Sequence, residues 1–114
     1  MYSGLEGCIN VIVFSEVLFV YINAATGKKS YELKRKPELV KSVKLNDIRE
    51  LLGKYRTLDT GESVKSEAEK LITKYGLLPN DALIAATCKH YGITKIATFD
   101  SDFERIDFLE VITL

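Results

Sequence analysis

The sequence predicts one α/β domain built around a parallel β-sheet. Segments with helical spacing alternate with short apolar strand-like segments, an order that places parallel strands side by side with helices on their faces. The alternation is clearest near the end of the chain, where two helical segments precede the apolar runs Ile93–Phe99 and Leu109–Leu114. The chain has 114 residues, 46% hydrophobic and 28% charged, which suits a globular protein with a modest core. We expect a single domain over residues 1–114.

The first apolar segment of the chain allows two interpretations. In the first, a short strand over Ile9–Val13 leads to Ser15, which caps a helix that ends near Asn23. In the second, the whole run is one buried helix. The segment ends at Thr26 and Gly27 in either case, because glycine readily adopts the conformation that follows a helix.

The middle of the chain has weaker patterns. Ser30–Arg35 has helical character, and Pro37 interrupts or restarts that helix because proline lacks a backbone donor. Leu45–Tyr55 has apolar residues at helical spacing, with Asn46 as its expected cap. Arg56–Thr60 is then a candidate for a short strand.

The second half of the chain has the clearest helix signals. One amphipathic helix begins at Ser63 and ends at Gly76, and another runs from Asn80 or Asp81 to Gly92. A buried strand, a turn and a final strand should follow at Ile93–Phe99, Phe103–Ile106 and Leu109–Leu114. Each helix has one mainly apolar face. In the first helix it consists of Val64, Ala68, Leu71, Ile72 and Tyr75, and in the second of Leu83, Ile84, Ala86, Thr87 and Cys88.

Two carboxylates stand where regular elements begin or end, and a third lies within an apolar segment. Glu16 is embedded in an apolar run, Asp81 opens a helix, and Asp100 directly follows a predicted strand. In an open α/β sheet, functional groups gather beyond the carboxyl ends of the strands, so the fold can unite these residues. Carboxylates held close together repel one another, and a divalent cation relieves that repulsion. The sequence therefore predicts a metal site formed by Glu16, Asp81 and Asp100.

Each of these residues also has a purely structural interpretation. Asn80 or Asp81 can serve only as a helix N-cap, and the Asp100-Ser-Asp102 segment can serve only as a turn. His90 lies at a helix C-terminus, where a favourable contact with the helix dipole explains it better than catalysis does. The cysteines, Cys8 and Cys88, lack metal-ligand spacing and are expected to be reduced thiols.

The net charge of zero conceals an uneven distribution. Residues 28–56 contain ten bases and four acids, a net charge of +6, whereas the residues after Arg56 carry −4. A basic middle beside acids that hold metal would suit a nuclease, although a solvated surface explains the charges equally simply. No apolar run approaches the ~20 residues that span a bilayer, and the first residues do not resemble a signal peptide. We expect a cytoplasmic protein without membrane association.

At this point the pattern resembles a known family. Asn80–Thr87 and, after an interval, Ile96–Phe103 are similar to the closing half of a PIN domain, the fold of the VapC-type toxin ribonucleases. Upstream, Val13–Leu18 matches the glutamate-bearing helix of that family, and Arg56–Asp59 fits its intermediate strand. The resemblance extends from about Ile9 to the end of the chain.

The resemblance implies a fold, a chemistry and partners. The fold would be a three-layer α/β/α arrangement with a central parallel sheet. Glu16, Asp81 and Asp100 match the catalytic, metal-binding acids of the family, while Thr98 and Asp102 match groups that support the site. Family members use Mg²⁺ or Mn²⁺ to cleave RNA, which would make this chain an endoribonuclease. By the same resemblance, an antitoxin protein would insert near the acids.

The chain departs from the family pattern at its start. Family members begin with a central strand that ends in an aspartate, and nothing in Met1–Cys8 supplies that element, so the domain is expected to be N-terminally truncated. A partner chain, a rearranged sheet or an inward shift of Ile9–Phe14 could fill the gap. Since unpaired buried strand edges are costly, we expect a homo-oligomer.

Two functions are therefore consistent with the sequence. The first is a metal-dependent ribonuclease of the PIN/VapC toxin type, impaired by the missing aspartate. The second is a catalytically inactive PIN-like module that acts in protein binding, nucleic-acid binding or oligomerisation. The missing aspartate favours the second function, and the remaining acids favour descent from the first.

Overall fold

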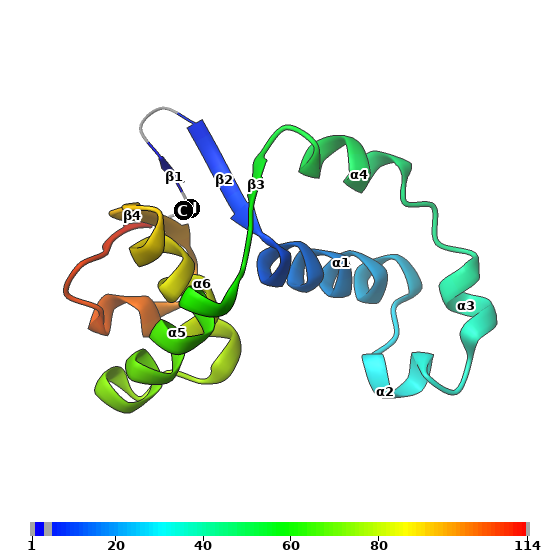
Figure 1. Cartoon of the computed structure of the whole chain (residues 1–114). Helices are drawn as coiled ribbons and strands as arrows, with labels where there is room; N and C mark the ends of the chain where they lie inside the picture. The colour runs from blue at the N-terminus through cyan, green and yellow to red at the C-terminus, as the bar shows by residue number, and fades with distance from the viewer. Residues whose placement is uncertain (1, 4–5, 114) are drawn as a thin grey trace.

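The computed structural model describes residues 2–3 and 6–113 and has a five-stranded sheet with helices on both sides (Figure 1). The strands lie in the order β3-β2-β1-β4-β5. β2 and β3 are parallel to each other, as are β4 and β5, so the predicted α/β class is confirmed. The strands are β1 (Tyr2–Ser3), β2 (Glu6–Asn10), β3 (Arg56–Leu58), β4 (Lys95–Thr98) and β5 (Glu110–Thr113).

The centre of the sheet is held by the two-residue strand β1. It pairs antiparallel with both neighbours, through Tyr2 opposite Gly7 of β2 and Tyr2 opposite Lys95 of β4. Of the three solutions considered for the expected gap, this arrangement matches a rearranged sheet. An inward shift of Ile9–Phe14 is wrong, because Ile9 of β2 pairs with Thr57 of the edge strand β3 and the helix has already begun at Val11.

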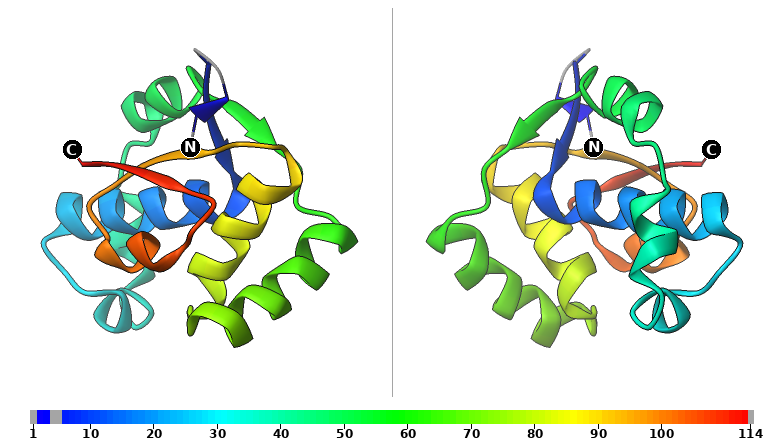
Figure 2. Two further views of the ribbon diagram at one scale, coloured as in Figure 1. Left: turned by 90° about the vertical axis from the view of Figure 1, so that its left-hand side faces the viewer. Right: turned by 90° about the vertical axis from the view of Figure 1, so that its right-hand side faces the viewer.

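The helices form two groups along the chain. Figure 1 shows α1 leading away from the end of β2, with α2, α3 and α4 returning around its far end, whereas α5 and α6 pack side by side against the sheet in Figure 2. The first group is α1 (Val11–Thr26), α2 (Ser30–Leu33), α3 (Pro37–Lys41) and α4 (Asn46–Leu52). The second is α5 (Glu62–Tyr75) and α6 (Pro79–His90), followed by the 3-10 helix η1 (Ser101–Arg105).

The core is divided between the two faces of β2. Cys8 and Ile9 are consecutive, so their side chains point to opposite faces of the strand. Cys8 belongs to the larger cluster, which α5, α6, β4 and η1 complete. Ile9 belongs to a smaller cluster with Ile48 and Leu52 of α4, against which one side of α1 packs. The predicted three-layer arrangement is confirmed.

Helix α1 begins and is placed differently from both interpretations of the sequence. Asn10 caps it by accepting a hydrogen bond from the backbone N–H of Val13 at 2.9 Å, so Ser15 is not the cap. The helix ends at Gly27, whose φ of 67° is favourable only for glycine. None of its side chains is fully buried, so the interpretation as a buried helix is wrong.

Most other elements agree with the sequence within a few residues. Pro37 occupies the first turn of α3, which fits its fixed φ, and Gly76 ends α5 as expected. One error matters for the site: β4 ends at Thr98, and Phe99 is exposed rather than part of a buried strand. Within the described residues, no helix has the length and apolarity needed to cross a bilayer.

Candidate metal centre

The fold brings the three predicted acids to one cavity. Glu16 lies in the second turn of α1, Asp81 in the first turn of α6, and Asp100 directly after β4. Together with Thr98 they line a cavity of about 170 Å³, which apolar side chains such as Ile84 and Phe103 also line. Residues that are distant in the chain therefore face a common space, as the sheet-edge argument predicts.

A fourth acid, Asp102, contributes to the same cluster. The side chains of Asp81, Asp100 and Asp102 each offer a carboxylate oxygen within 4.8 Å of the other two. Glu16 is not part of that closest group, although it lines the cavity with Asp81 and Asp100. The arrangement thus has three acids in close proximity and a fourth approaching from α1.

Hydrogen bonds within the turn after β4 fix the positions of two acids. The backbone N–H of Asp100 donates to the Thr98 hydroxyl at 3.0 Å, and the N–H of Asp102 donates to an Asp100 carboxylate oxygen at 2.8 Å. Asp100 is therefore the N-cap of η1, which confirms the turn-forming role considered for it. One of its oxygens is engaged in the turn, and the other is free of that bond and available to a ligand.

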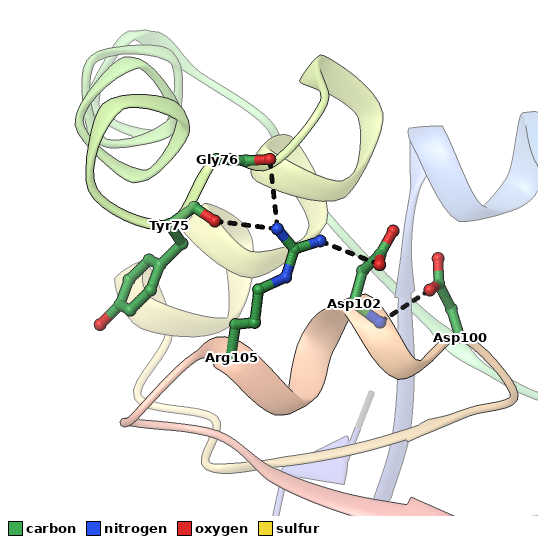
Figure 3. A network of polar contacts seen from close by, with 5 residues as sticks. All are labelled: Tyr75, Gly76, Asp100, Asp102 and Arg105. Carbon is green, nitrogen blue, oxygen red and sulfur yellow. Dashed lines mark hydrogen bonds and ion pairs between the residues drawn. The ribbon is translucent and has the colours of Figure 1, made fainter.

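Arg105 connects this acidic turn to the end of α5 (Figure 3). Its guanidinium forms an ion pair with Asp102 at 2.9 Å and donates to the carbonyl oxygens of Tyr75 at 3.1 Å and Gly76 at 3.4 Å. The link between α5 and α6 leads directly into the turn that holds Asp81. Arg105 therefore ties the acidic turn to the segment that positions Asp81. Only its spacing of three residues from Asp102 hinted at this role in the sequence.

The electrostatics of the cluster are unfavourable without a counter-charge. The pKa of Asp81 is raised above the ordinary aspartate value, first because partial burial removes water from the carboxylate, and then because Asp100, Glu16 and Asp102 repel its charge. Arg105 opposes the increase. A divalent cation would stabilise such a cluster, because it offsets the repulsion that raises the pKa of Asp81.

A buried polar link between α1 and α6 was not foreseen. The Asn10 side-chain amide donates to the Thr87 hydroxyl at 2.9 Å, and that hydroxyl donates to the Leu83 carbonyl oxygen at 2.7 Å. Asn10 and Thr87 are both fully buried. The spacing of Thr87 places it on the apolar face of its helix, so the sequence gives no sign of its hydrogen bond to Asn10. An asparagine directly before a helix, such as Asn10, is a recognisable capping signal. The link joins the helix of Glu16 to the helix of Asp81.

Helix α6 decides several of the structural alternatives that its sequence allows. Leu78 is the N-cap of α6, and Pro79 begins the helix, so neither Asn80 nor Asp81 is the cap. His90 is exposed at the end of α6, as expected. Cys88 is buried and its thiol is free, and burial raises its pKa to about 11, which makes it a poor ligand and nucleophile.

The donor set suits a hard cation. Carboxylate and hydroxyl oxygens are the ligands that Mg²⁺ and Mn²⁺ prefer, and Glu16, Asp81, Asp100 and Thr98 supply only such atoms to the cavity. The cysteines Cys8 and Cys88 and the histidine His90 do not line it. The residues present therefore fit the predicted metal, and their roles as ligands stay a prediction.

Comparisons with known proteins identify the family. The chain is 50% identical over 108 residues to ribonuclease VapC2 of Methanocaldococcus jannaschii, covering 95% of this chain and 72% of that protein. It is 44% identical over 120 residues to ribonuclease VapC6 of the same organism, covering 96% and 78% respectively. The fold is similar to a chain of a toxin-antitoxin complex from Klebsiella pneumoniae, with a TM-score of 0.63 and 19% identity over 95% of this chain and 73% of that chain. The sequence model of the PIN domain family matches residues 2–109, and the chain therefore belongs to the PIN domain family.

Proposed function

We propose that this chain is a metal-dependent endoribonuclease of the VapC toxin type. The observation that carries the proposal is the cavity shared by Glu16, Asp81 and Asp100, because three acids from separate elements converge there. The two M. jannaschii relatives, which are ribonucleases by name, support RNA as the substrate. Mg²⁺ or Mn²⁺ is the proposed cofactor, and the cytoplasm is the proposed location.

The roles of the side chains follow from their positions. A bound cation would activate water and stabilise the leaving oxygen of the phosphodiester. Glu16, Asp81 and Asp100 would bind it through carboxylate oxygens. Thr98 keeps Asp100 in place by accepting the hydrogen bond from its backbone N–H. Asp102 is already paired with Arg105, so we assign it a supporting role that adds negative charge at the side of the cavity.

The centre of the sheet is the reason to keep the second function. The family pattern has an aspartate at the end of its central strand, whereas the central strand here is β1, a Tyr-Ser pair that runs antiparallel to its neighbours. A site without that carboxylate would bind its cation less tightly, and activity would be reduced accordingly. The inactive binding module is the limit of that reduction.

Cleavage of RNA tests the proposal directly. The wild-type chain should cut single-stranded RNA when Mg²⁺ or Mn²⁺ is added, and chelation with EDTA should stop the reaction. Asp81→Asn should lose activity by at least about a hundredfold, because it removes one charged ligand while nearly keeping the side-chain shape.

Asp47→Asn is the matched control, since Asp47 is an exposed acid in the first turn of α4 and does not line the cavity. Its activity should equal that of the wild type. Cleavage that persists in EDTA, or that is equally lost in both variants, would contradict the proposal. Absence of cleavage with either cation would leave the binding module as the function.

Partners form the second part of the proposal. The likeness to a toxin-antitoxin complex supports an antitoxin protein that binds close to the acids, and the apolar surface of α1 supports self-association. Light scattering after size-exclusion chromatography should give a mass above that of one chain of 12.8 kDa. A monomer at all concentrations would contradict the homo-oligomer.

A further inference from the structure

A second cavity lies away from the acids, where α1, α4 and the start of β3 meet. Its volume is about 370 Å³, and most of the side chains that line it are apolar, such as Leu18 of α1 and Ile48 of α4. Glu16, Asp81 and Asp100 do not line it. This space, which we call the α4 pocket, has a volume in the range of about 300–1,000 Å³ that is typical of small-molecule sites.

Two aromatic rings from different elements line the α4 pocket. Phe14 belongs to α1, and Tyr55 directly precedes β3. Each is 41% exposed, so part of each side chain is in contact with water. A ligand with an apolar body would displace that water, and a flat ring would pack well against the aromatic side chains.

The ring of Tyr55 is held against the sheet. A Cβ atom placed on Gly7 of β2 would lie 2.7 Å from Cδ1 and 2.9 Å from Cε1 of Tyr55. Side chains do not approach one another so closely, so the glycine is what allows the ring to lie directly on the backbone of the strand. This wall of the pocket is therefore already formed, and a ligand would spend little free energy on ordering it.

Arg49 is the only charged residue that lines the α4 pocket. Leu45 and Leu52, four residues before it and three after it, line the pocket too, as expected for one side of a helix. The nearest acids in sequence, Asp47 and Glu50, are two residues before and one after, spacings that do not bring side chains together on a helix. Within the described part of the chain, no side-chain hydrogen bond or ion pair engages Arg49. Its guanidinium is therefore available to a ligand.

From the apolar walls and this one available cation, we propose that the α4 pocket binds a small aromatic carboxylate. The ring of the ligand packs against Phe14 and Tyr55, and its carboxylate pairs with the guanidinium of Arg49, whose planar fork matches the two carboxylate oxygens. A cationic ligand would be repelled by Arg49, and inorganic phosphate would leave the apolar walls uncovered. Neither metal binding nor RNA cleavage requires this ligand, so the inference goes beyond the proposed function.

A protein is the competing occupant, and two observations favour the small anion. Ten residues line the pocket, whereas a stable protein interface takes about 20–30 residues from each partner. α4 lies within residues 28–56, the segment with a net charge of +6. That charge attracts a small anion, but it opposes a second copy of the chain that would bring the same segment to the pocket.

The test uses the full chain and anilinonaphthalene sulfonate, an aromatic anion whose fluorescence increases in apolar surroundings. Two ligands with the same ring system, 2-naphthoate and its uncharged amide 2-naphthamide, then compete with the dye. 2-Naphthoate should displace the dye at a concentration at least about tenfold lower than 2-naphthamide, because only the carboxylate forms a charge-assisted pair with Arg49.

Two variants of arginine show whether Arg49 selects the anion. Arg49→Met removes the charge and keeps an apolar stem, so it should weaken 2-naphthoate about tenfold and leave 2-naphthamide unchanged. Arg35→Met is the matched control, since Arg35 is also exposed and belongs to residues 28–56 but does not line the pocket. It should bind both ligands as the wild type does. Arg49→Lys keeps the charge without the fork and should give an intermediate affinity.

Each of four results would overturn the inference. The first is equal competition by the two ligands, because the pocket would then not select a charge. The second is an equal loss of 2-naphthoate affinity in Arg49→Met and Arg35→Met, or no loss in either. The third is no dye binding by the wild type. The fourth is dye binding that decreases as the concentration of the chain rises, which would assign the pocket to a second copy. RNA cleavage is measured separately, and its presence or absence changes none of these results.

Discussion

Helices α1 and α6 are both rich in apolar residues, yet they have opposite surroundings. α6 has six buried residues and lies between α5 and the sheet, whereas α1 has none fully buried although Glu16 is its only charged residue. Small residues explain part of the difference, since Ala82, Ala85 and Ala86 let α6 approach its neighbours closely. α1 contacts the rest of the chain along one side, and its other apolar side chains form surface that is available for ligands and partners.

Truncating one side chain in each helix would measure this contrast. The truncation in α6 has the largest expected effect on the free energy of unfolding. Ile84→Ala on α6 should lower the free energy of unfolding by about 2–5 kcal/mol, because Ile84 is 4% exposed and a cavity would remain. Val20→Ala on α1 should change it by less than ~0.5 kcal/mol, since Val20 is 69% exposed. Urea denaturation of both variants gives the two values. Similar losses would mean that α1 is as well packed as α6.

The buried link between the two helices should have the next largest effect. Thr87→Val keeps the shape of the side chain but leaves the buried amide of Asn10 without its acceptor, which should cost about 1–3 kcal/mol. Thr87→Ser restores the hydroxyl and should recover most of that loss. Chemical denaturation at one temperature compares the three proteins. If Thr87→Val is as stable as the wild type, the hydrogen bond between the helices contributes nothing to stability.

A smaller effect should appear in the pH dependence of the metal-free protein. Because the pKa of Asp81 is raised on folding, the folded chain holds its proton more tightly than the unfolded chain does. Stability should therefore increase as pH falls through the window between the ordinary aspartate pKa of about 3.9 and the raised value. Cation affinity should fall in the same window, since protonated Asp81 is a poor ligand.

Thermal unfolding in EDTA over that pH range, for wild type and Asp81→Asn, isolates this contribution. The difference in melting temperature between the two proteins should shrink as the pH is lowered. The variant should be the more stable one at neutral pH, because it lacks the charge that the other acids repel. A constant difference at every pH would show that Asp81 titrates normally.

The α5–α6 half could be predicted from sequence because its signals are local. Gly76 ends a helix through its backbone conformation, and the periodic apolar residues Val64, Ala68 and Leu71 identify the buried face. Ile72, placed on the same face from its spacing, is partly exposed, since the neighbouring helix covers a narrower stripe than the pattern suggests. The gathering of Glu16, Asp81 and Asp100 was also predictable, because Asp81 and Asp100 stand beside element ends and Glu16 lies early in α1 near the same edge of the sheet.

The rest depends on contacts between distant parts of the chain. The apolar sequence of α1 predicts that the helix is buried. How much of it is buried depends on where the other helices lie, and this is not encoded in the local sequence. Phe99 follows a β-branched, apolar run, which predicts that it belongs to the strand. In the structure the strand ends one residue earlier, where the Thr98 hydroxyl accepts a hydrogen bond from the backbone N–H of Asp100. The pairings of Arg105 with Tyr75 and of Asn10 with Thr87 join residues far apart in sequence, which no local pattern encodes.

Titration of the protein with Mn²⁺ by isothermal calorimetry tests most directly whether the converging acids form a cation site. Wild type and Asp47→Asn should bind Mn²⁺ with the same affinity, and Asp81→Asn should bind at least about tenfold more weakly, because it loses a charged oxygen ligand. Equal affinities in all three proteins, or no binding by the wild type, would contradict the account.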